Sequence, residues 1–98
     1  MAKGYLIAEI DVQDAPRYAQ YTAQTPAAIA RHGGKFVVRG GAVDAVEGQP
    51  PQGRVVVVEF PNLEAAQTFY QSEEYQPLIA IRQSASRGRV FLVEGADA

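Results

Sequence analysis

The sequence predicts one α+β domain in the order β-α-β-β-α-β, with a four-stranded antiparallel sheet and the helices on one face. Two observations lead to this prediction. Four segments have strand composition, and helical stretches separate the first from the second and the third from the fourth. This order is the ferredoxin-like arrangement, and 98 residues are the size of a single domain, 1–98.

The strand segments are recognised by their β-branched and aromatic residues. They are Gly4–Asp11, Lys35–Gly40, Arg54–Phe60 and Arg89–Glu94, and the third contains four consecutive valines. A loop rich in glycine and proline, residues 41–53, joins the second strand to the third. We expect a small hairpin within it, around Val43 to Val46.

Capping residues and prolines mark the helices. The first helix is predicted to begin after Asp14, a good N-cap, with Pro16 tolerated in its first turn. Pro26 lies inside the helical pattern, and we expect it to kink or split the helix. The second helix is predicted to begin after Asn62, and residues 72–77 interrupt it before a further short helix.

The second face of the sheet predicts a partner. Alternate strand residues point to opposite faces, and one face is almost purely apolar, as expected beneath helices. The other face adds Glu9, Arg39, Glu59 and Arg89 to valines and aromatic residues, and is still too apolar for water. We therefore expect an identical chain to cover it in a two-fold homodimer. The alternative is a solvated sheet that tolerates a few valines.

Arg39 and Glu59 are the first candidates for a functional site, because charges on a buried face must pair or be hydrogen-bonded. One reading is an ion pair between Arg39 and a glutamate that fixes the register of the dimer. The other is a pocket in which Arg39 holds an anionic substrate and a glutamate exchanges a proton. The spacing of the residues does not separate these readings.

Four further residues are candidates for lining that pocket. We expect Tyr18 and Tyr21 between sheet and helix, with Tyr75 and Arg82 near the mouth. The alternatives are that the tyrosines belong to the core and that Arg82 extends to solvent. His32 lies at the end of the first helix, where capping is the simpler role and a catalytic base the other.

Composition excludes several function classes. The net charge of −2 argues against binding nucleic acid, and the strand aromatics form no RNA-stacking platform. One histidine, no cysteine and scattered carboxylates predict no metal site. No cofactor-binding motif is present, so we expect no cofactor. The first residues reach Glu9 too soon for a signal peptide or membrane span, so a cytoplasmic location is expected.

The segment HGGKFVVRGG, residues 32–41, resembles the hallmark of a widespread bacterial family of small domains of unknown function. Glu47-Gly48, Arg54–Asn62 and Ser72–Tyr75, with Arg82 beyond them, are similar to the same family. The resemblance implies the dimeric α/β-barrel superfamily. Members of that superfamily include cofactor-free monooxygenases of polyketide quinones, muconolactone-type isomerases and haem-binding peroxidases, and the haem branch fits poorly because nothing marks His32 as an axial ligand.

Two functions follow as hypotheses. The first is a homodimeric, cofactor-independent enzyme or binding protein for a small anionic or aromatic metabolite, with oxygenation or isomerisation as reactions that the fold analogy suggests. The second is a non-catalytic dimeric module in which Arg39 and the glutamates only hold the interface. The second hypothesis predicts a filled interior with no space for a ligand.

Overall fold

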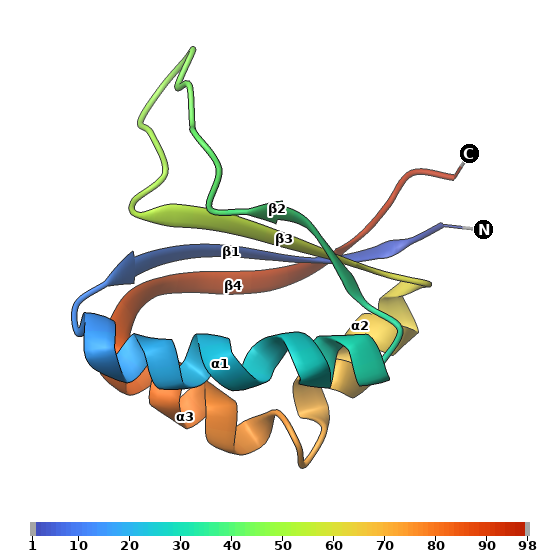
Figure 1. Cartoon of the computed structure of the whole chain (residues 1–98). Coiled ribbons are helices and arrows are strands. Elements are labelled where there is room, and N and C mark those ends of the chain that lie inside the picture. The colour runs from blue at the N-terminus through green and yellow to red at the C-terminus, as the bar shows by residue number, and fades with distance from the viewer. Residues whose placement is uncertain (1, 98) are drawn as a thin grey trace.

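The computed structural model describes residues 2–97 and contains four strands and three helices (Figure 1). Their bounds are β1 (Gly4–Val12), α1 (Ala15–Arg31), β2 (Lys35–Arg39), β3 (Arg54–Phe60), α2 (Leu63–Gln71), α3 (Gln76–Ala85) and β4 (Ser86–Glu94). The sheet is antiparallel throughout, in the order β2-β3-β1-β4. All three helices lie on one face of it (Figure 1). The predicted ferredoxin-like α+β fold is confirmed, and no helix in residues 2–97 is long and apolar enough to span a membrane.

The predicted caps position the helices. Asp14 accepts a hydrogen bond from the backbone N–H of Arg17, and Asn62 accepts one from Ala65, so both serve as N-caps. The predicted split at Pro26 is wrong, because α1 is continuous through it. The buried side of α1 extends on both sides of the proline, so packing on the core offsets the lost backbone hydrogen bond.

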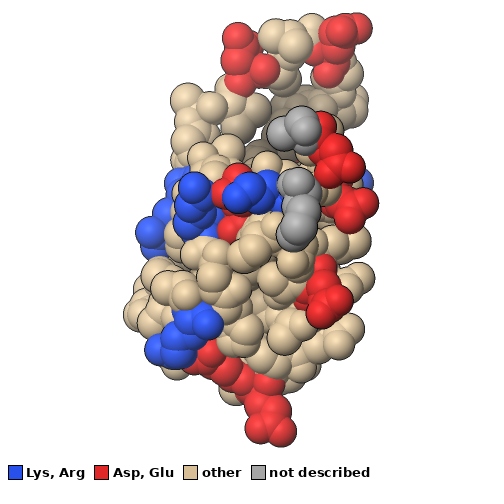
Figure 2. Space-filling model, turned by 90° about the vertical axis from the view of Figure 1, so that its right-hand side faces the viewer, with Lys and Arg blue, Asp and Glu red and all other residues tan. Residues whose placement is uncertain are grey.

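The loop between β2 and β3 contains no strand, so the hairpin expected around Val43–Val46 is wrong. An isolated two-stranded hairpin is marginal without a packing surface, and Val46 is 81% exposed. The loop rises from the sheet on the side opposite the helices (Figure 1). Figure 2 shows acidic side chains gathered at its tip, away from the basic ones on the body of the domain.

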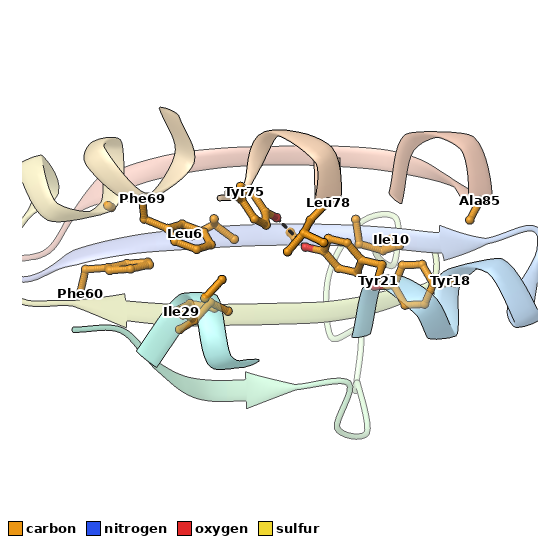
Figure 3. Packing of buried hydrophobic residues seen from close by; sticks show 14 residues of the cluster. Leu6, Ile10, Tyr18, Tyr21, Ile29, Phe60, Phe69, Tyr75, Leu78 and Ala85 are labelled. Carbon is orange, nitrogen blue, oxygen red and sulfur yellow. Dashed lines mark hydrogen bonds between the residues drawn. The ribbon is translucent and has the colours of Figure 1, made fainter. Parts of the chain in front are cut away.

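The core lies between the sheet and the helices (Figure 3). Phe60 of β3 and Phe69 of α2 stack with ring centroids 5.2 Å apart, and Tyr75, between α2 and α3, lies 4.3 Å from Phe69. All three are fully buried. This aromatic cluster fixes α2 and the start of α3 over the sheet, and thereby places the residues that face α1.

A β-bulge in β2 changes which face Arg39 occupies. Phe36 pairs with Val58, but Val38 then pairs with Val57 and Arg39 with Val56, so the register shifts by one residue. Cross-strand partners point to the same face, so Arg39 joins the helix-covered face. Its guanidinium lies 4.2 Å from the ring of Phe36. The prediction that Arg39 shares the outer face with the glutamates is therefore wrong.

The outer face keeps its apolar side chains exposed in the single chain. Val37, Val38, Phe91 and Val93 are each 40–47% exposed. Its two glutamates pair within the chain. Glu9 pairs with Arg89 at 2.9 Å, and Glu59 pairs with Lys35 at 3.4 Å and accepts a hydrogen bond from the Tyr5 hydroxyl at 3.4 Å. Among residues 2–97, Arg39 forms no ion pair with a glutamate.

Candidate functional site

A cavity of about 40 Å³ lies between the helix-covered face of the sheet and helices α1 and α3. Its walls are largely apolar, from β1, β2, β3 and α1, with Phe69 of α2. The polar groups are three tyrosines, two threonines and three arginines: Tyr18, Tyr21, Thr22, Thr25, Arg39, Arg54, Tyr75 and Arg82. No described residue that lines it is an aspartate, a glutamate or a histidine.

Two tyrosine hydroxyls meet in the cavity wall. The hydroxyl oxygens of Tyr21 and Tyr75 lie 2.5 Å apart, a short hydrogen bond drawn as a dashed line in Figure 3. Tyr75 is 1% exposed, and burial, followed by the neighbouring Tyr21, raises the pKa of its phenol far above the ordinary value. Tyr75 therefore stays protonated. In a pair of neutral phenols, one donates to the other and the second O–H remains free to donate onward.

Tyr18 lies beside this pair on α1, with its ring centroid 5.4 Å from that of Tyr21. Burial raises the pKa of Tyr18, and the positive charge of Arg54 partly offsets this. Thr25 does not serve as a donor to the cavity, because its hydroxyl donates to the backbone carbonyl of Tyr21 at 2.6 Å. The hydroxyl-bearing wall is therefore made chiefly by the three tyrosines.

The three arginines occupy different depths. Arg82 is 5% exposed and donates to the Tyr70 hydroxyl at 3.5 Å, so the expectations that it lies near the mouth or reaches solvent are both wrong. Arg54 has a buried Nε with no hydrogen-bond acceptor. Arg39 is exposed and marks the mouth. Within residues 2–97, none of the three forms an ion pair with a carboxylate.

The structure brings together five of the six predicted ligand-binding residues, namely Tyr18, Tyr21, Arg39, Tyr75 and Arg82. Tyr75 is deep rather than near the mouth, because the turn between α2 and α3 folds it beneath the helices. Glu59 lies on the opposite face of the sheet with Lys35 and Tyr5. A proton-exchanging role for Glu59 in this cavity therefore has no geometric basis.

Arg54 lines the cavity but was not among the predicted residues. The signal was present in the sequence, since Arg54 shares its parity along the strand with Val56 and Val58, which belong to the helix-covered face. Its position as the first residue of β3 concealed this, because a strand terminus often extends into solvent.

His32 lies outside the cavity. It is the C-cap of α1, and its Nδ1 donates to the carbonyl of Ala28 at 2.9 Å. Its ring packs edge-on against Phe69. Its Nδ1 lies 3.8 Å from a carboxylate oxygen of Glu74, which also pairs with Arg31. These contacts match the capping interpretation and give His32 no access to the residues of the cavity.

Comparison with solved structures shows the same fold in three other proteins. A protein of unknown function from Rhodopseudomonas palustris is 18% identical, with 99% of this chain and 85% of that chain covered and a TM-score of 0.77. SnoaB, a cofactor-independent oxygenase from Streptomyces nogalater, is 14% identical over 100% of this chain and 97% of its own, with a TM-score of 0.71. An EthD-family protein from Bacillus halodurans is 12% identical over 100% of both chains, with a TM-score of 0.51.

The TM-scores show that this chain shares the fold of these proteins, and the low identities leave its activity open. A search among curated proteins finds no match. The sequence profile of one family matches residues 3–96, nearly the whole chain. The chain therefore belongs to the family described as "Domain of unknown function (DUF1330)".

Proposed function

We propose that the protein binds a small organic compound in the cavity and acts on it without a cofactor. The observation that carries the proposal is the buried hydroxyl pair of Tyr21 and Tyr75 in the largely apolar wall of the cavity. A neutral phenol held by a partner hydroxyl is a preorganised donor to a carbonyl or phenolic oxygen. Polar groups at a few points of an apolar cavity are the usual composition of a ligand site.

The groups that line the cavity suit reactions in which negative charge develops on oxygen. Tyrosine O–H groups and arginines stabilise an enolate or a phenolate. The described lining contains no carboxylate or imidazole to remove a proton, so the favoured substrates are those acidic enough to release a proton to water, such as acidic phenols and β-dicarbonyl compounds. The likeness to SnoaB, a cofactor-independent oxygenase, supports oxygenation of such an anion by dioxygen as the reaction class.

The size of the cavity limits the ligand. A volume of 40 Å³ accommodates roughly three water molecules, whereas sites for drug-sized ligands have about 300–1,000 Å³. The bound compound is therefore small, or inserts one end and extends through the mouth at Arg39. The competing hypothesis of a non-catalytic module requires a filled interior. A cavity whose arginines form no ion pair with a carboxylate of residues 2–97 disfavours it.

A titration with small phenols and β-dicarbonyl compounds tests the proposal. NMR chemical shifts should change at Tyr21 and Tyr75, and Tyr21→Phe should weaken binding. Tyr5→Phe removes a hydroxyl from the outer face and is the matched control, with binding unchanged. If none of these compounds shifts the resonances of the cavity, the protein does not have this function.

We further propose that two copies pair through the outer face of the sheet. The exposed Phe91 and Val93 lie on this face, and its glutamates and basic residues pair among themselves, so it presents apolar surface with balanced charge to an identical face. Light scattering at micromolar concentration should give twice the monomer mass. A monomer at that concentration would contradict the pairing and leave the cavity proposal standing.

A further inference from the structure

The positive charge of the cavity has no counterpart among residues 2–97. Arg39, Arg54 and Arg82 all line it, while the ion pairs of residues 2–97 use other basic residues. We infer that the cavity is a carboxylate site, in which Arg54 and Arg82 hold the acid group of a small organic acid. This inference rests on the proposed function and deepens it to a substrate class.

Arg54 supplies the clearest sign of a missing acceptor. Its Nε is the one buried side-chain nitrogen or oxygen among the described residues that has no hydrogen-bond partner. A buried donor without an acceptor is costly, and native structures leave few of them. The Nε–H of an arginine and one terminal N–H point in parallel, which matches the two oxygens of a carboxylate. A carboxylate bound in the cavity, with the guanidinium of Arg54 turned to meet it, would satisfy this nitrogen.

The chain is shaped to keep Arg54 in this position. Gly40 lies directly against the guanidinium, and a Cβ there would come within 3.0–3.3 Å of three of its atoms. Gly40 also has a φ of +72°, which a residue with a side chain rarely adopts. The end of β2 thus leaves space for the guanidinium and supplies no carboxylate to it.

Arg82 is the second half of the site. It is 5% exposed, and its recorded polar contact is the neutral Tyr70 hydroxyl. A buried charge normally requires an opposite charge, and none is provided by the described residues. An anion from outside the chain would supply it.

Each of these two arginines lies beside one of two neighbouring tyrosine rings. Burial raises the pKa of Tyr18, and the positive charges of both arginines act to lower it. The guanidinium of Arg54 lies 5.9 Å from the ring of Tyr18, and that of Arg82 lies 5.9 Å from the ring of Tyr21. The two rings are themselves 5.4 Å apart. Arg39 stands at the mouth, where its charge attracts an approaching anion. The acid group would thus lie deep, with the tyrosine hydroxyls beside it.

An NMR titration with pairs of equal shape tests the inference. Propionate and benzoate are compared with propionamide and benzamide, and we expect each acid to bind at least about tenfold more tightly than its amide. Phenol serves as a neutral ligand of the proposed function. If the amides bind as well as the acids and phenol also binds, the carboxylate site is overturned and the proposed function stands. If none of these compounds binds, both are overturned.

Variants locate the anion. Arg54→Gln should lower the affinity for propionate by about 10- to 100-fold, since charge-assisted hydrogen bonds are lost. The control is Arg87→Gln, which removes the same charge from an exposed residue of β4 outside this cavity and should leave affinity unchanged. If Arg54→Gln fails to fold, Arg54→Lys replaces it, because lysine keeps the charge and lacks the paired N–H groups. Unchanged propionate affinity in the folded variant would overturn the assignment.

Discussion

Replacing Tyr75 by phenylalanine removes one hydroxyl from the buried pair and keeps the ring in the aromatic cluster. The lost hydrogen bond contributes about 1 kcal/mol net, and leaving the Tyr21 hydroxyl without its partner adds a comparable cost. We expect the free energy of unfolding to fall by about 1–2 kcal/mol. For a domain of 98 residues this lowers Tm by about 5–15 °C.

Thermal and urea unfolding followed by circular dichroism measure this change. Tyr5→Phe is the control, because its half-buried hydroxyl makes a 3.4 Å contact with Glu59, and we expect it to cost less than about 0.5 kcal/mol. A double-mutant cycle with Tyr21→Phe should give a coupling free energy of at least about 0.5 kcal/mol. Tyr75→Phe with unchanged stability, or a cycle with no coupling, would refute the view that the hydroxyl pair stabilises the fold.

Three further predictions concern pH, assembly and backbone geometry. The free energy of unfolding should fall as pH rises above 10.0, because burial raises the pKa of Tyr75 and the unfolded chain releases a proton that the folded chain keeps. Urea unfolding at several pH values should show a smaller fall in stability for Tyr75→Phe than for the unchanged protein. An equal fall in both would contradict this. Phe91→Lys should produce monomers in light scattering, because it places a charge on the outer face proposed for pairing. Arg39→Gln should remain dimeric, since Arg39 lies on the helix-covered face. A loss of pairing in Arg39→Gln would contradict the position that the bulge gives to Arg39. Gly53→Ala should lower the free energy of unfolding in urea by at least about 3 kcal/mol, because the added Cβ would lie 2.0 Å from a carbonyl oxygen of β1. Gly48 has a similar φ but lies in open space, so Gly48→Ala should cost about 1 kcal/mol. Equal costs would show that the close approach at Gly53 is unimportant.

Local signals in the sequence were sufficient for most of the fold. Asp14 and Asn62 cap the helices as predicted, and strand composition identified all four strands, although β4 begins at Ser86 rather than Arg89. That earlier start includes Gly88, which has a φ of +159° and no side chain to contribute to an alternating pattern. Composition therefore indicated β4 without its first three residues, 86–88.

The candidate site was predictable where it depends on residue type and not where it depends on register. The tyrosines and Arg82 were identified because aromatic and basic residues at helical spacing suit a cavity wall. Arg39 was assigned to the wrong face, because strict alternation assumes an unbroken ladder and β2 has a bulge beside Val37. Glu59 was then placed with Arg39 in one pocket, and the sheet separates them.

The bulge also bears on how chains of this family are compared. A single residue gained or lost in β2 ahead of Arg39 would rotate that guanidinium to the other side of the sheet, from the helix-covered face to the surface proposed for pairing. Two homologues that both retain the arginine could then differ in charge both at the mouth of the cavity and at the contact between copies. Equivalence between them is set by the count of residues from the bulge, and an alignment that matches the arginines alone would conceal the difference.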